Sequence, residues 1–150
     1  MTAMQTEALT ADELVKIARK QIEAFNNGDW EQLRALLSSD ASYHEFGTER
    51  AIEAPEEIIE AFKGWKTAFP DAAGTVTSSV ASGDTAVLEV TWKGTQTGPL
   101  TTAAGTIPAS GKSQETPAAV FYVFEGAKIK ASRHYFDAMT LLKQIGAEPK

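Results

Sequence analysis

The segment at residues 85–95, TAVLEVTWKGT, alternates large apolar side chains with polar or smaller ones at a period of two. Such a pattern predicts a β-strand with one face buried and the other less buried. A strand of this kind must belong to a sheet that packs one face against other elements of the fold. The side chains predicted to share the buried face are Ala86, Leu88, Val90 and Trp92.

The second half of the chain contains further strand patterns. Residues 74–82 alternate in the same way, and Ser82-Gly83-Asp84 predicts a tight hairpin before the next strand. Strand-like segments follow at residues 115–124 and 128–136, separated by a short turn. Residues 94–112 are rich in Gly, Thr, Pro and Ser and predict a long loop, which in a compact domain is usually a lid or a rim.

The first half carries helix signals. Thr10 and Glu13 form a capping box, and Asp29 predicts a second, short helix. Residues 41–46 predict a short strand. Pro55 suits the first turn of a third helix, which Pro70-Asp71 and Gly74 close. The apolar stripe of that helix is Ile58, Phe62, Trp65 and Phe69.

Helices therefore precede a run of strands, and a short helix ends the chain. This order predicts an α+β domain with a curved, mostly antiparallel sheet and helices on one side. The length of 150 residues fits a single domain over residues 1–150, with a flexible N-terminus at residues 1–10.

Composition excludes several functions. The formal net charge is -6 and the Lys and Arg residues are scattered, which argues against nucleic-acid or anionic-membrane binding. No apolar run is long enough to span a membrane, and the first residues carry no secretory signal. There is no cysteine, and the two histidines form no metal-binding motif, so we expect a cytoplasmic protein without a metal site.

Several segments resemble the SnoaL-like polyketide cyclases of the nuclear transport factor 2-like superfamily. The resemblance covers about residues 13–146, nearly the whole chain. It is carried by AFNNGDWEQLRALLSSD, IIEAFKGWKTAFPD, WKGTQTGPL, GAKIKASRHYFD and LLKQIG.

The resemblance implies a cone-shaped α+β barrel whose sheet curls around an internal pocket. Cyclases of this family close a ring of a polyketide ester by intramolecular aldol condensation, without a metal or cofactor. An aspartate near the C-terminus acts as acid and base, and Asp137 is the matching position. The superfamily also includes ketosteroid isomerases and epoxide hydrolases, so the fold alone does not fix the reaction.

Asp137 has two interpretations. It directly precedes a helical pattern, where aspartate is a favoured N-cap, and a capping carboxylate has a lowered pKa. As a pocket acid it would instead need a raised pKa. Strict alternation places Arg133, Tyr135 and Asp137 on one face of the last strand, and His134 and Phe136 on the other. His134 is the second candidate for acid–base chemistry, and Arg133 or Tyr135 for stabilising an enolate oxygen.

Aromatic residues are candidates for a ligand-binding wall, with core packing as the alternative for each. In this fold the first strand usually reaches the pocket mouth, which makes Tyr43, His44 and Phe46 candidates. The others are Trp65, Trp92 and Phe121, which are large enough to line a cavity for a flat ligand.

We therefore expect an enzyme of cyclase or isomerase type that acts on a small hydrophobic carbonyl compound. The apolar residues 118–121 favour a more hydrophobic ligand than a typical polyketide. An epoxide hydrolase would need a second carboxylate, for which Glu45, Glu89 and Glu115 are the strand candidates. A non-catalytic ligand-binding protein is the third possibility. Association through the open sheet face is common in the superfamily, so we expect a homodimer.

Overall fold

A computed structural model of the chain describes residues 9–147. Most of the N-terminal segment expected to be flexible, residues 1–8, lies outside this range. The helices are α1 (Ala11–Asn27), α2 (Trp30–Leu36), α3 (Pro55–Ala68) and α4 (Ala138–Gln144). The strands are β1 (Leu37–Glu45), β2 (Arg50–Glu53), β3 (Ala73–Ser82), β4 (Thr85–Thr95), β5 (Leu100–Thr102), β6 (Gly105–Ile107), β7 (Ser113–Glu125) and β8 (Lys128–Phe136).

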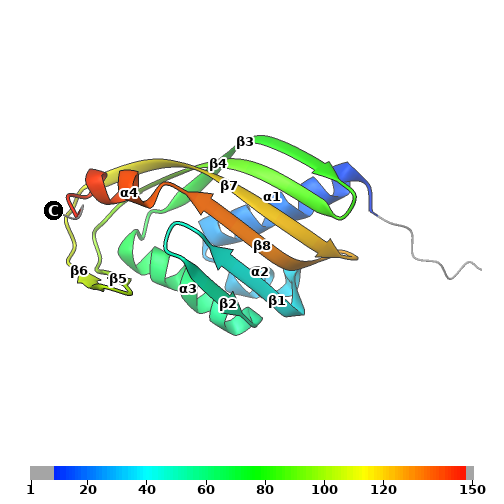
Figure 1. Cartoon of the computed structure of the whole chain (residues 1–150), viewed down its shortest axis with the longest axis horizontal. Coiled ribbons are helices and arrows are strands. Elements are labelled where there is room, and N and C mark those ends of the chain that lie inside the picture. The colour runs from blue at the N-terminus through cyan, green and yellow to red at the C-terminus, as the bar shows by residue number, and fades with distance from the viewer. Residues whose placement is uncertain (1–8, 148–150) are drawn as a thin grey trace, which may run out of the picture.

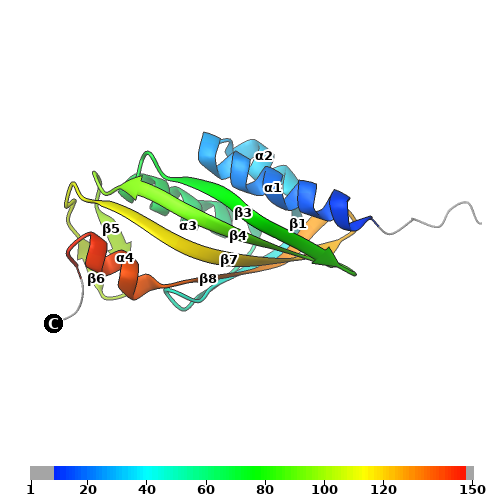
Figure 2. The same cartoon turned by 90° about the horizontal axis from the view of Figure 1, so that it is seen from above.

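Six strands form one curved sheet in the order β2-β1-β8-β7-β4-β3. Only β1 and β8 pair in parallel, and the other neighbours are antiparallel. In Figure 1 the open face of the sheet is toward the viewer and α1–α3 lie behind it; Figure 2 shows α1 and α2 along one side of the strands. The predicted α+β class, with a mostly antiparallel sheet and helices on one side, is confirmed.

The predicted caps set the helix ends. The Thr10 side chain accepts a hydrogen bond from the Glu13 amide at 3.1 Å, and the Glu13 carboxylate accepts one from the Thr10 amide at 2.8 Å. Gly28 ends α1 in the left-handed conformation with φ 66°. Asp29 then caps α2 by accepting from the Gln32 amide at 3.1 Å. Gly28 and Asp29 thus form the turn between α1 and α2, and the Thr10 capping box sets the start of α1.

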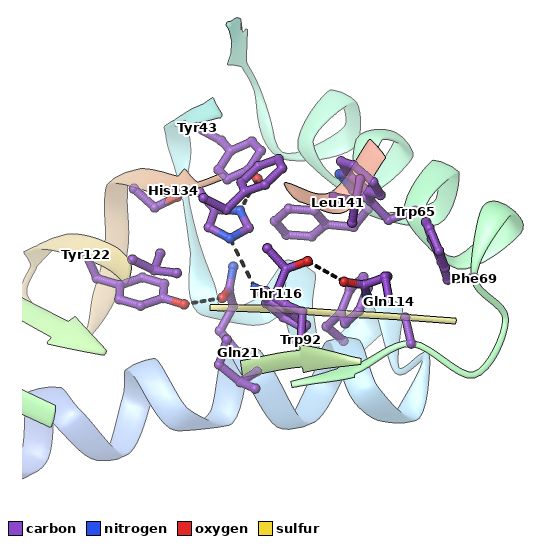
Figure 3. Close-up of a pocket in the computed structure, with 17 residues that line it drawn as sticks. Gln21, Tyr43, Trp65, Phe69, Trp92, Gln114, Thr116, Tyr122, His134 and Leu141 are labelled. Atoms are coloured by element: carbon purple, nitrogen blue, oxygen red, sulfur yellow. Dashed lines mark hydrogen bonds between the residues drawn. The ribbon is translucent and has the colours of Figure 1, made fainter. Parts of the chain in front are cut away.

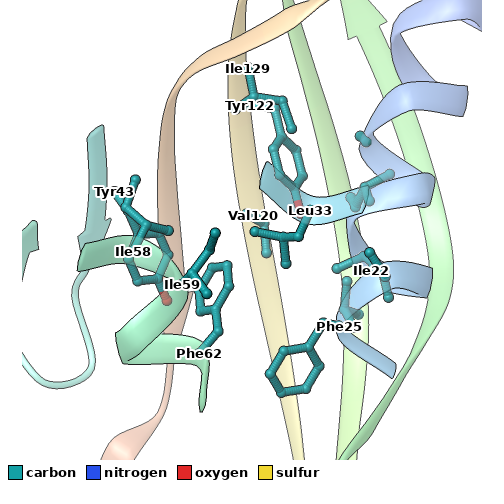
Figure 4. Packing of buried hydrophobic residues seen from close by; sticks show 14 of the residues in the cluster. Ile22, Phe25, Leu33, Tyr43, Ile58, Ile59, Phe62, Val120, Tyr122 and Ile129 are labelled. Carbon is teal, nitrogen blue, oxygen red and sulfur yellow. The ribbon is translucent and has the colours of Figure 1, made fainter. Parts of the chain in front are cut away.

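The core lies between the inner face of the sheet and α1–α3 (Figure 4). On β4, Ala86, Leu88 and Val90 are at most 1% exposed, as their alternation predicts. On α3, Ile58 and Phe62 are buried, and so is Phe69 directly after the helix, whereas Trp65 of the same stripe is only partly buried. The apolar side chains that recur along each element therefore face the space between the sheet and the helices. None of the helices within residues 9–147 is long and apolar enough to cross a membrane.

Three elements differ from the sequence prediction. β1 begins at Leu37 rather than residue 41, because Leu37 is already paired with Ile129 of β8. β2 was not predicted, because its four residues have little apolar alternation and are held by pairing with β1. The predicted long loop contains the β5–β6 hairpin.

Gln96 anchors this long connection. It is fully buried, and its amide nitrogen donates to the carbonyl oxygens of Gly98, Ile107 and Pro108 at 3.1–3.3 Å. Its amide oxygen accepts from the Ser110 amide at 3.2 Å. One side chain thus satisfies several backbone groups that a buried loop would otherwise leave unpaired.

Gly98 docks the same connection onto α3. Its amide donates to the Ala68 carbonyl at 3.2 Å, and a Cβ added at Gly98 would lie 2.0 Å from the Thr67 carbonyl oxygen. We expect Gly98→Ala to lower the free energy of unfolding by about 1–3 kcal/mol, because the connection must move away from α3. Urea unfolding measures this change.

The matched control is Gly64→Ala, since a Cβ at Gly64 in α3 meets nothing within 4 Å. Alanine there should raise the free energy of unfolding by about 0.5–1 kcal/mol through helix propensity. Equal stability of Gly98→Ala and the wild-type protein would show that the connection does not rest on α3.

Candidate active site

A cavity of about 80 Å³ lies between the inner face of the sheet and helices α1 and α3, and Leu141 of α4 also lines it. Figure 3 shows its lining, which is mostly apolar and aromatic. Three T-shaped ring pairs centred on Phe25 give the wall a fixed shape, with Trp92, Phe62 and Trp30 at centroid distances of 5.3, 6.0 and 6.2 Å. The aromatic lining consists of Phe25, Tyr43, Phe62, Trp65, Phe69, Trp92, Tyr122 and Phe136, beside the imidazole of His134.

His134 places its titratable imidazole ring at the cavity wall. It lies on β8 on the inner face of the sheet, opposite Arg133 and Tyr135 as the alternation predicts, although the prediction turned the face of Arg133, Tyr135 and Asp137 toward the pocket. Its Nδ1 lies 2.9 Å from the Tyr43 hydroxyl, and its Nε2 accepts from the Trp92 indole N–H at 3.1 Å. An indole nitrogen can only donate, so Nε2 carries no proton and the neutral ring is protonated at Nδ1.

Tyr43 links this ring to a buried carboxylate. With Nδ1–H donating to the Tyr43 oxygen, the Tyr43 hydroxyl donates to Glu45 Oε2 at 2.6 Å. Glu45 is 0% exposed, and Trp65 donates its indole N–H to the same oxygen at 2.9 Å. The other carboxylate oxygen accepts from Arg50 at 2.9 Å and from the Thr48 hydroxyl. Each oxygen of the Glu45 carboxylate therefore accepts at least two hydrogen bonds.

Burial and hydrogen bonding set the protonation states. Burial alone would raise the pKa of Glu45, but hydrogen bonds from Thr48, Tyr43 and Trp65 and the charge of Arg50 outweigh it, so that pKa lies below its usual value. Burial lowers the pKa of His134 to about 4, with partial opposition from the Glu45 charge. At neutral pH the site therefore holds a charged carboxylate and a neutral imidazole.

Two glutamines place amide groups at the cavity. The Gln21 oxygen accepts from the Tyr122 hydroxyl at 2.7 Å, and the Gln114 oxygen accepts from Thr116. Neither Gln nitrogen, nor the Ser132 hydroxyl, bonds to a group within residues 9–147. Because fully buried side-chain nitrogens and oxygens in this range all have partners, the unpaired donors are not fully buried, and all three residues line the cavity. Gln21, Gln114 and Ser132 are each less than 7% exposed.

Asp137 lies outside the cavity. It is exposed, and it caps α4 by accepting from the Thr140 amide at 3.1 Å and the Thr140 hydroxyl at 2.6 Å. These hydrogen bonds hold its pKa below the usual value. The geometry corrects the prediction of a pocket acid: Asp137 is the helix cap, because the strand alternation turns it away from the side of His134.

Other predicted ligand contacts also lie away from the cavity lining. On the open sheet face, Phe46 stacks on Tyr135 at 4.4 Å and on His44 at 3.8 Å. Phe121 packs against Tyr135 on this face, with the Arg133 guanidinium over its ring. These five residues line the surface because β1, β7 and β8 alternate them away from the helices. The predicted contacts that do line the cavity are Tyr43, Trp65, Trp92 and His134.

The sequence alone did not single out Gln21, Gln114 or the role of Glu45. The signal for Glu45 was its position two residues after Tyr43 on one strand, which places both side chains on the inner face. The signal for Gln21 was a polar residue on the buried side of an amphipathic helix. Within residues 9–147, no cluster of three or more His, Asp or Glu side chains is arranged to hold a metal ion.

The fold and cavity define a small α+β pocket protein of the nuclear transport factor 2-like type. The sequence profile described as SnoaL-like polyketide cyclase matches residues 15–145. The chain therefore belongs to the SnoaL-like polyketide cyclase family. No curated protein matches it by sequence.

Solved structures agree with this fold. A proposed SnoaL-like polyketide cyclase from Jannaschia sp. CCS1 superposes with a TM-score of 0.83 at 18% identity, over 97% of this chain and 99% of that one. IdmH, a proposed polyketide cyclase from Streptomyces antibioticus, gives 0.73 at 25% identity, over 88% and 97%. A protein with a ketosteroid isomerase-like fold from Catenulispora acidiphila, solved with trimethylamine, gives 0.75 at 18% identity, over 89% and 93%. Family membership supports a role of cyclase type, and these neighbours support the fold.

Proposed function

We propose that this protein is a cofactor-independent cyclase or isomerase that acts on a small, flat, neutral carbonyl compound, with His134 as the general base. The observation that carries this proposal is the neutral His134 ring at the wall of an aromatic cavity, with its Nδ1 tied to Tyr43 and its unprotonated Nε2 bonded only to Trp92. The apolar lining suits a hydrophobic ligand.

The chemistry needs three functions. When the ligand displaces the Trp92 indole, His134 Nε2 takes a proton from a carbon next to a carbonyl group. The resulting enolate oxygen accepts hydrogen bonds from the free amide nitrogens of Gln21 or Gln114 or from Ser132. The imidazolium then returns its proton to carbon, which completes an isomerisation, or to the alkoxide formed by aldol ring closure.

The cavity favours this reaction over epoxide hydrolysis. Within residues 9–147 no carboxylate lines the cavity, and Glu89 and Glu115 are exposed on the sheet. Glu45 is buried behind the lining with all its lone pairs occupied by donors. The acid that an epoxide hydrolase needs is therefore missing from the lining.

A second function, ligand binding without turnover, is favoured by one contact. The Trp92 N–H occupies the lone pair on His134 Nε2 that a base must use. If a ligand fits beside this contact without breaking it, the protein is a carrier.

A panel of neutral cyclic ketones and β-keto esters distinguishes the two functions. Binding is measured by fluorescence, because Trp65 and Trp92 line the cavity whereas Trp30 does not. Proton abstraction is measured by NMR as exchange of the α-hydrogen for deuterium in D₂O, which requires no knowledge of the final product. An enzyme catalyses exchange in the compounds it binds; binding without exchange across the whole panel would identify a carrier.

We also propose that the chain forms a homodimer through the open sheet face. Phe46 and Tyr135 are 36% and 40% exposed there and stack on each other, which is an unusual surface to leave in water. Light scattering after size exclusion should give twice the 16.1 kDa of one chain. Tyr135→Glu should give the monomer, while Lys20→Glu, at an exposed residue of α1 on the other side of the sheet, should leave the dimer intact. A monomeric wild-type protein would reject the proposal.

A further inference from the structure

Glu45 is a buried charge that does not line the cavity. Its carboxylate is linked to His134 through the Tyr43 hydroxyl, which contacts both His134 Nδ1 and Glu45 Oε2. Trp65, which also lines the cavity, donates to the same Glu45 oxygen but does not contact His134. Arg50, 39% exposed at its side chain, is the counter-ion on the far side of the carboxylate. A buried carboxylate costs folding free energy unless it is fully hydrogen-bonded, and here it is. Its position behind the lining indicates an indirect role.

Hydrogen bonds link Trp92, His134, Tyr43 and Glu45 in series, and the donor and the acceptor of each bond are fixed. The Trp92 indole can only donate, and the ionised Glu45 can only accept. Tyr43 must therefore donate to Glu45 and accept from His134 Nδ1–H, which leaves Nε2 as the acceptor toward Trp92. Both ends of the chain impose the same tautomer on His134.

We propose that Glu45, acting through Tyr43, is a positioning residue that holds His134 in the Nδ1–H tautomer and faces the imidazolium formed during reaction. When a ligand displaces Trp92, only the Glu45–Tyr43 end still fixes the tautomer, so Nε2 stays unprotonated and directed at the cavity. The catalytic part of this proposal rests on the proposed function; the tautomer does not, and is tested separately. The groups that contact the His134 ring are Tyr43, Trp92 and Phe136, and the charged groups of the cluster are Glu45 and Arg50.

The test combines Trp92→Phe and Glu45→Gln as single and double variants. The measurement is the ¹⁵N chemical shifts of the His134 ring nitrogens at pH 7, which distinguish the two tautomers. Trp92→Phe alone should keep the Nδ1–H form, because Glu45 still orients Tyr43. In the double variant the Gln amide can donate to Tyr43, so the Nε2–H form should become populated. A mixture of tautomers in Trp92→Phe alone would overturn the proposal.

Tyr43→Phe gives a second route if Glu45→Gln does not fold. It removes the linking hydroxyl and keeps the carboxylate, Arg50, Thr48 and Trp65 together. Combined with Trp92→Phe, Tyr43→Phe should also lead to population of the Nε2–H form of His134. Retention of the Nδ1–H form in both double variants would also reject the proposal.

Kinetics test the catalytic part. With a compound that undergoes exchange, Glu45→Gln should lower kcat by about tenfold or more and leave KM within twofold, because Glu45 does not touch the ligand. Glu89→Gln is the matched control, since it removes a strand carboxylate that is exposed and has no contact with His134. Unchanged kcat in Glu45→Gln would reject the positioning role. A complete lack of exchange in the wild-type protein would reject the proposed function and leave the tautomer result standing.

Discussion

Replacing His134 with asparagine is expected to lower the rate of α-hydrogen exchange by about 10²–10⁴-fold, the contribution typical of a general base. Asparagine keeps an N–H group that can donate to Tyr43 but has no basic nitrogen. Its shape also leaves the aromatic walls in place, so ligand affinity measured by Trp fluorescence should change little. Loss of exchange with retained binding would show that His134 acts on the reacting carbon rather than on the shape of the cavity.

Asp137→Asn is the matched control. Asparagine caps a helix about as well as aspartate, so α4 should remain folded. Because the Asp137 carboxylate is exposed and bonded to Thr140, exchange should stay within about twofold of the wild-type rate. The opposite pattern, with Asp137→Asn inactive and His134→Asn active, would return the acid–base role to Asp137 and overturn the site described above.

The stability of the protein should fall as the pH drops from 6.5 toward 4. The pKa of His134 is lowered by burial from 6.5 to about 4, so in this range the unfolded chain binds a proton that the folded chain does not. Proton uptake by the unfolded state favours unfolding, and the effect vanishes above pH 6.5. The full difference is at most about 3 kcal/mol, because each pKa unit corresponds to about 1.4 kcal/mol.

Urea unfolding at several pH values measures this loss. His134→Asn removes the titrating ring, so its free energy of unfolding should depend less on pH between 6.5 and 4.5. Glu45 acts in the same direction at lower pH: its pKa is lowered in the folded state, so its contribution is lost below its usual value of 4.5. Parallel pH profiles for wild type and His134→Asn would show that His134 is not buried in its neutral form.

The sequence by itself determined the local structure. Thr10, Glu13 and Asp29 predict their caps because a cap depends on residues only three positions apart. The alternation of residues 85–95 predicts the buried face of β4, and that of residues 133–136 places His134 opposite Arg133 and Tyr135. Short-range spacing was enough for the α+β class and for placing His134 opposite Arg133 and Tyr135, but not for showing which of these two faces is the inner one.

The tertiary structure decided which residues meet at the cavity. Tyr43 and His134 are 91 positions apart and become partners because β1 pairs with β8 in parallel. Gln21 and Tyr122 are 101 positions apart and meet because α1 packs across the sheet. No local pattern encodes such pairs. Asp137 shows the same limit: its spacing allowed a cap or a pocket acid, and only the direction of its carboxylate in the folded chain distinguished the two, because function here depends on contacts made across the sheet.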